Sequence, residues 1–147
     1  MLKLNSPAPE FSLQDQNEVT HNLAQYRGKK VLIYFYPKDD TPGCTTEACS
    51  FRDNYEELTK AGLVVLGISK DSVKSHKKFA DKFTLPFPLL SDETTETAKA
   101  YGVWKLKKFM GREYMGIDRV SFLIDENGNI EKIYEGVKPA VHVEEDS

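Results

Sequence analysis

The sequence lacks an excess of basic residues and long apolar runs. It has 20 Lys and Arg against 23 Asp and Glu, a formal charge of −3. A nucleic acid is held by positive potential, so we expect no nucleic-acid partner.

The longest apolar run, Val31–Tyr36, is far shorter than the roughly 20 residues of a membrane span. The first five residues contain no apolar stretch of signal-peptide length. We therefore expect no membrane association and a cytoplasmic location.

Cysteine is scarce, with only Cys44 and Cys49. In a reducing compartment such a pair is more often catalytic or metal-binding than structural. Four residues separate the two, so the Cys-x-x-Cys motif of disulfide exchangers is absent. Zinc needs about four ligands, and His21, His76 and His142 show no ligand spacing. We therefore expect no metal, and we expect His21 and His76 at the surface.

Repeats, low-complexity tracts and flexible linkers are also absent, so residues 1–147 are predicted to form a single domain. A hydrophobic content of 39% is sufficient for a real core. The pattern predicts an alternation of strands and helices, with strands at 31–36, 63–68, 87–90, 119–125 and 130–134 and helices at 42–60, 72–83 and 94–101.

The first strand, Val31–Tyr36, has no polar alternation, which is typical of a central strand covered on both faces. Right-handed crossovers place the strand at 63–68 beside it. Asn127-Gly128 predicts a terminal antiparallel hairpin. The sequence thus indicates an α/β, thioredoxin-like fold with a mixed central sheet flanked by helices.

Cys44 lies at the predicted start of a helix. Thr41 suits the N-cap and Pro42 the first helical position. In the first turn, unpaired N–H groups and the helix dipole favour a thiolate. The alternative is a small buried core residue, but the constrained loop of Thr41, Pro42 and Gly43 predicts an exposed, nucleophilic sulfur.

Cys49 lies five residues further along the same helix, which separates the two Cα atoms by about 8.6 Å. A disulfide does not close beyond about 7 Å without backbone movement. A Cys44–Cys49 bond would therefore require the first turns of this helix to unwind.

The stretch Pro37–Cys49, PKDDTPGCTTEAC, closely resembles the active-site motif of peroxiredoxins, specifically the bacterioferritin comigratory protein or peroxiredoxin Q group. Further segments similar to that group follow in order, so that the resemblance covers nearly the whole chain: 35–37, 51–53, 65–69, 89–92, 101–104 and 119–125.

The resemblance implies a thiol peroxidase that reduces hydrogen peroxide and organic hydroperoxides. Cys44 matches the peroxidatic cysteine and Cys49 the resolving cysteine, and the two would form an intramolecular disulfide. Thr41, Pro37 and Arg119 match the residues around the peroxide.

The same resemblance implies that four groups would bind the substrate oxygens: the Thr41 hydroxyl, the N–H groups of Gly43 and Cys44, and the Arg119 guanidinium. The family implies thioredoxin or a similar reductant, no haem, flavin or metal cofactor, and a monomer or weak dimer.

The sequence leaves several alternatives open. Arg119 also fits a solvated strand end and Thr41 a plain helix cap. Glu47, one turn after Cys44, fits either a residue that only favours the helix N-terminus or a candidate for the site. The segment Phe109–Met115 fits either a pocket lining or an interface. A disulfide exchange protein and a redox-regulated holdase are the competing functions.

The end of the chain departs from the group's pattern. The group usually continues past 137–140 into a last helix, but this chain stops at Ser147, so we expect that helix to be missing or short.

Overall fold

The computed structural model describes residues 2–135. A five-stranded sheet has the order β5-β4-β3-β8-β9, and its strands are β3 (Lys30–Phe35), β4 (Leu63–Ser69), β5 (Leu89–Ser91), β8 (Val120–Ile124) and β9 (Ile130–Glu135). β4 runs parallel to β3, and β8 runs antiparallel to it. The predicted mixed sheet with a central first strand is confirmed.

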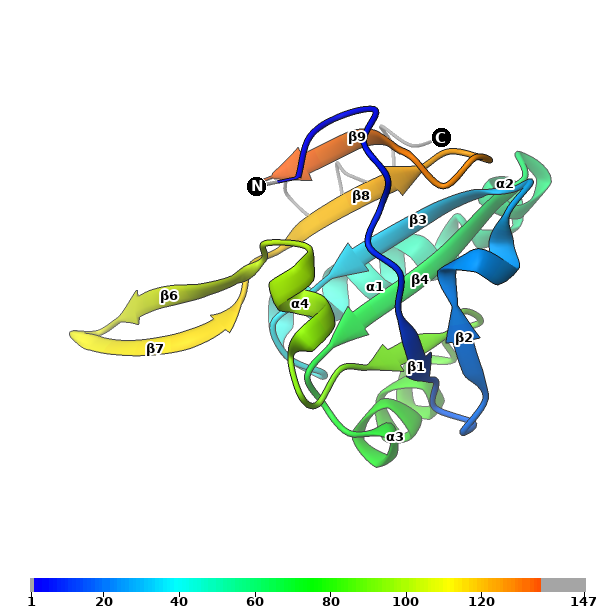
Figure 1. Cartoon of the computed structure of the whole chain (residues 1–147). Helices are drawn as coiled ribbons and strands as arrows, with labels where there is room; N and C mark the ends of the chain where they lie inside the picture. Colours follow the sequence, from blue (N-terminus) through cyan, green and yellow to red (C-terminus); the bar gives the residue numbers. More distant parts are fainter. Residues whose placement is uncertain (1, 136–147) are drawn as a thin grey trace.

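Helices cover both faces of this sheet (Figure 1). They are α1 (Pro42–Asp53), α2 (Tyr55–Lys60), α3 (Val73–Phe83) and α4 (Glu96–Ala100). Alternate residues of β3 enter two different cores. Val31, Ile33 and Phe35 join the cluster that includes α4, whereas Leu32 and Tyr34 join the cluster that includes α1 to α3. Burial on both faces explains the missing polar alternation of this strand.

The helix predicted over 42–60 is in fact two helices, α1 and α2, and that single-helix prediction is wrong. The break lies at Asn54, whose backbone has φ −107° and ψ 6°. The Asn54 side-chain Nδ2 donates to the Ser50 carbonyl at 2.9 Å. A side chain that competes for the carbonyl four residues earlier disturbs a helix, and the apolar face continues across the break through Phe51 and Leu58.

Other boundaries differ by one or two residues. β5 begins two residues later than predicted, and α4 is shorter at both ends than the predicted helix at 94–101. The hairpin of β8 and β9 forms at the predicted turn, with a register shift between Leu123 and Ile124. At the amino-terminal end, β1 (Ser12–Gln14) pairs with β2 (Thr20–Asn22), and the 3-10 helix η1 (Leu23–Tyr26) follows; these elements were not predicted.

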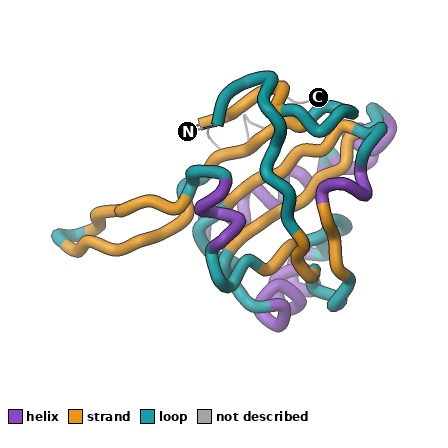
Figure 2. Tube along the Cα trace, in the orientation of Figure 1, coloured by secondary structure: helices purple, strands orange, loops and turns teal. Residues whose placement is uncertain are grey.

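A second unpredicted hairpin is formed by β6 (Trp104–Phe109) and β7 (Arg112–Ile117). It projects from the body of the molecule (Figures 1 and 2). Its tip residues Phe109 and Met110 are exposed over 66% and 87% of their surface. The segment Phe109–Met115 therefore lies on a projecting arm.

The prediction of a missing or short last helix, like the position of His142, falls outside the described residues. Within residues 2–135, no helix has the length and apolar character needed to cross a bilayer.

Candidate active site

Cys44 is the third residue of α1, directly after the loop that leaves β3. Thr41 is the N-cap and Pro42 the first helical residue, as predicted. The Thr45 N–H donates to the Thr41 carbonyl at 2.8 Å and closes the first turn. The expected exposed sulfur is wrong, because Cys44 is exposed over only 1% of its surface. The residue packs in the core cluster on the α1 side of the sheet, so the loop leads the thiol inward.

Arg119 lies against the thiol of Cys44. The Arg119 Nη2 is 3.4 Å from Cys44 Sγ. The position of Arg119 follows from the sheet register, in which Val120 at the start of β8 pairs with Phe35 at the end of β3. Arg119 directly precedes β8, and this pairing therefore brings its guanidinium to α1, the helix that follows β3. Arg119 is not a solvated strand-end charge, since 23% of its side chain is exposed.

Glu47 is the partner of Arg119 and is a buried residue. Its Oε1 accepts a hydrogen bond from Arg119 Nη1 at 2.8 Å, and the residue is only 1% exposed. Burial raises the pKa of Glu47 to about 7, against the lowering effect of Arg119. Of the two alternatives for Glu47, its contact with Arg119 favours a place in the site over an effect on the helix N-terminus alone. Its position one turn after Cys44 is the signal in the sequence, because residues three apart share one side of a helix.

Thr41 and Gly43 shape the approach to this pair. The Thr41 hydroxyl makes no side-chain cap and instead donates to the Lys38 carbonyl at 2.9 Å. A plain capping role is therefore wrong for this side chain. A Cβ on Gly43 would lie 2.9 Å from Arg119 Nη2, so a side chain at this position would displace the guanidinium from its observed position. Pro37 is partly buried in the loop between β3 and α1.

Cys49 is partly exposed, and both cysteines are free thiols. They lie in the uninterrupted helix α1, as the predicted spacing requires for the reduced protein. The structure thus places Cys44, Arg119 and Glu47 in one cluster and leaves Cys49 further along the helix.

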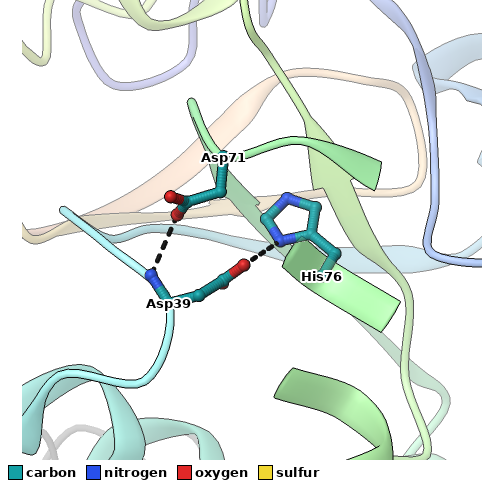
Figure 3. Close-up of side chains that lie close together, drawn as sticks. All are labelled: Asp39, Asp71 and His76. Atoms are coloured by element: carbon teal, nitrogen blue, oxygen red, sulfur yellow. Dashed lines mark hydrogen bonds and ion pairs between the residues drawn. The ribbon is translucent and has the colours of Figure 1, made fainter. Parts of the chain in front are cut away.

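A second polar cluster lies beside the same loop and contains Asp39, Asp71 and His76 (Figure 3). The prediction that the histidines lie at the surface is wrong, because His76 is 0% and His21 8% exposed. Each is buried against an aspartate. His76 Nδ1 lies 2.7 Å from Asp39 Oδ2, and His21 Nε2 lies 2.7 Å from Asp15 Oδ2. Pairing with a carboxylate is what permits such burial.

Comparison with known proteins fits this geometry. A model of the AhpC/TSA family matches residues 4–133. The chain belongs to that family. It is 51% identical over 144 residues to a putative peroxiredoxin bcp of Coxiella burnetii, covering 98% of this chain and 95% of the relative. It is 50% identical over 141 residues to peroxiredoxin Bcp of Escherichia coli, covering 96% and 90%.

Solved structures agree with this assignment. The bacterioferritin comigratory protein of Xanthomonas campestris superposes with a TM-score of 0.86 at 38% identity, covering 92% of this chain and 86% of that one. The thioredoxin-like fold and the bacterioferritin comigratory protein group are therefore confirmed. The chain is a peroxiredoxin, and its enzyme class is thiol peroxidase. The disulfide-exchange and holdase alternatives are not favoured.

Proposed function

We propose that this peroxiredoxin, acting as a single domain over residues 1–147, reduces hydrogen peroxide and organic hydroperoxides with Cys44 as the nucleophile. The observation that carries the proposal is the 3.4 Å contact between Arg119 Nη2 and Cys44 Sγ in the first turn of α1. The similar Xanthomonas campestris protein is described as having alkyl peroxide reduction activity, which supports the organic part of the substrate range.

In the first step, the Cys44 thiolate attacks one oxygen of the peroxide. The O–O bond breaks, the sulfur is oxidised to a sulfenic acid, and the other oxygen leaves as water or alcohol after taking up a proton. Negative charge develops on both oxygens. The Arg119 guanidinium, the Thr41 hydroxyl and the N–H groups of Gly43 and Cys44 are the donors that would stabilise it.

Access to the sulfur requires a small movement. Because Cys44 is only 1% exposed, peroxide enters after the neighbouring side chains are displaced. Pro37 has no N–H and a rigid ring, and we assign it the role of keeping water from the sulfur.

In the second step, the Cys49 sulfur attacks the sulfenic sulfur, the S–O bond breaks and water leaves, so that an intramolecular disulfide forms. Since both residues lie in the continuous helix α1, the first turns must unwind for the sulfurs to meet. Thioredoxin or a similar dithiol would then return the disulfide to two thiols. No haem, flavin or metal takes part in these steps.

We place the enzyme in the cytoplasm as a monomer or weak dimer, without a nucleic-acid or membrane partner.

Stopped-flow mixing of the reduced protein with hydrogen peroxide tests the proposal. We expect loss of one thiol equivalent into sulfenic acid, followed by the disulfide. Cys44→Ser should abolish the reaction, whereas Cys49→Ser should retain one stoichiometric reduction and lose cycling with thioredoxin. Full peroxidase activity in the Cys44→Ser variant would refute the assignment.

A further inference from the structure

The loop between β3 and α1 is held by a buried side chain, Asp39. It lies five residues before Cys44 and is 7% exposed. Its two carboxylate oxygens accept hydrogen bonds from the Tyr36 hydroxyl at 2.6 Å and the Ser75 hydroxyl at 2.8 Å. Its main-chain N–H donates to Asp71 Oδ2 at 2.9 Å (Figure 3). Asp39 therefore joins the loop to the end of β3, to α3 and to the turn after β4.

The fourth partner of this loop residue is His76 of α3, which is fully buried. Its Nδ1 lies 2.7 Å from Asp39 Oδ2 and its Nε2 lies 3.0 Å from the Leu90 carbonyl oxygen. A carbonyl only accepts, so Nε2 carries a proton. An ionised carboxylate also only accepts, so its 2.7 Å contact with Nδ1 is satisfied when Nδ1 carries a proton. A ring that is protonated on both nitrogens satisfies both contacts, and the geometry is therefore that of an imidazolium–carboxylate pair.

The other buried histidine–aspartate pair in the described residues, His21 with Asp15, differs in the protons that its contacts require. His21 Nδ1 lies 2.5 Å from the Tyr26 hydroxyl, and its Nε2 faces Asp15. A hydroxyl donates as well as accepts, so a neutral His21 satisfies both contacts. His76 Nδ1 also has a longer contact of 3.4 Å with the Tyr36 hydroxyl, but its two short contacts are to a carboxylate and a carbonyl, and a neutral ring would leave one of these without a donor.

A third contact of the loop is weak by comparison. Asp40 forms an ion pair with Lys82, with 2.8 Å between Oδ2 and Nζ. About half of each side chain is exposed, 46% for Asp40 and 59% for Lys82, and exposed ion pairs contribute little to stability. The buried His76–Asp39 pair, together with the hydrogen bond from the Ser75 hydroxyl to Asp39, thus links α3 to the loop that carries Thr41 toward Cys44.

We propose that His76, through its buried ion pair with Asp39, is a positioning residue for the peroxide reaction, which holds the loop before α1 in the conformation that presents Thr41 and Cys44 to peroxide. The inference rests on the proposed function of Cys44. The pair also limits the unwinding of α1 on its amino-terminal side when the Cys44–Cys49 disulfide forms. Breaking it should slow the first step and speed the second.

His76→Gln tests the proposal, with two matched controls. His21→Gln breaks the other buried histidine–aspartate pair. Lys82→Gln removes the exposed ion pair between α3 and Asp40 of the same loop. Misplaced catalytic groups lower rates by up to about 100-fold, so we expect the second-order rate of peroxide reaction to fall at least about tenfold in His76→Gln, with faster disulfide formation. Both controls should stay within about twofold of wild type.

The double variant Asp39→Asn with His76→Gln should recover most of the rate lost in His76→Gln, because removing both charges avoids an unpaired buried carboxylate. A general loss of stability would also speed disulfide formation, because α1 would unwind more readily, but it would not be rescued in this way. A His76→Gln variant that matches His21→Gln, or one that reacts faster with peroxide, would overturn the proposal.

A measurement on the unmodified protein does not depend on folding of the variants. The ¹⁵N chemical shifts of both His76 ring nitrogens at pH 7 should be those of an imidazolium, and one unprotonated nitrogen would overturn the inference. This readout needs no peroxide. If the wild-type thiols did not react with peroxide, the proposed function would fail while the charge state of His76 would still be measured.

Discussion

Glu47 and Arg119 form a buried ion pair, with Arg119 Nη1 2.8 Å from Glu47 Oε1. The same guanidinium contacts Cys44 Sγ through its other terminal nitrogen. Glu47 is thus separated from the sulfur by one planar group, and it fixes the orientation of that group. Because the carboxyl is buried, its own ionisation is costly, and this makes its contribution depend on pH.

Glu47→Gln should change how stability depends on pH. The pKa of Glu47 is raised from 4.5 in the unfolded chain to about 7 in the native protein, so between these values the native state binds more protons. The contribution of Glu47 is fully present below pH 4.5 and is lost as the pH rises through about 7. The unfolding free energy of the wild type relative to Glu47→Gln should therefore fall by about 3 kcal/mol over this window.

Urea unfolding of both proteins at a series of pH values measures this difference. Glu47→Gln keeps an oxygen that accepts from Arg119, and we expect it to retain more peroxidase activity than Glu47→Ala, which does not. A constant stability difference between pH 4 and pH 8 would contradict the buried, proton-binding state of Glu47.

Gly43→Ala should separate activity from stability. The added Cβ would lie 2.9 Å from Arg119 Nη2, and the flexible guanidinium can yield to it, so the fold should tolerate the change. Alanine also has a helix propensity better than that of glycine by about 1 kcal/mol. We expect an unchanged or higher melting temperature and a peroxide rate lowered about tenfold, because Arg119 is displaced from the sulfur.

Calorimetry on the Gly43→Ala preparation measures its melting temperature, and stopped-flow kinetics on the same preparation measures its rate of reaction with peroxide. A variant with wild-type kinetics would show that the position of Arg119 in the reduced protein does not limit the reaction.

Thr41→Val removes a hydroxyl while keeping the shape of the side chain. In the structure this hydroxyl donates to the Lys38 carbonyl at 2.9 Å, an exposed contact worth about 0.5–1.5 kcal/mol at most. We expect a stability loss of that size or less. A hydroxyl has one proton to donate, so in the proposed mechanism it turns from Lys38 to the peroxide, and loss of this donor should lower the peroxide rate by at least about tenfold. Thr41→Ser is the matched control and should react within a few-fold of wild type; equal losses in both variants would exclude a role for the hydroxyl.

The parts of this site that lie close together in the sequence were predictable. The apolar strand β3 and the helix start at Thr41 and Pro42 place Cys44 correctly in the first turn of α1, because local patterns determine both, whereas its burial depends on packing against the sheet. Arg119 came from family resemblance alone, since its contact with Cys44 depends on the register of β8 against β3. The burial of His76 was missed for the same reason, because its partner Asp39 is distant in the sequence.

The hairpin of β6 and β7 shows a different limit. Its turn is made by Met110 and Gly111, with φ of 50° and 77°. Both central residues of this tight turn have positive φ, a conformation for which Asn-Gly is the usual signal and methionine is uncommon. The turn was therefore not recognised, whereas Asn127-Gly128 identified the later hairpin.

Disulfide formation should unwind the first turns of α1. Reduced α1 is continuous across Cys44 and Cys49, and helical spacing holds their Cα atoms about 8.6 Å apart, beyond the reach of a disulfide. Hydrogen exchange of the amides of residues 44–50 should therefore be much faster in the oxidised protein than in the reduced one, with the amides of α3 unchanged. Oxidised Cys49→Ser, which forms no intramolecular disulfide, is the control and should keep its protection. Undiminished protection of residues 44–50 in the disulfide form would show that the two sulfurs meet by some other movement of the chain.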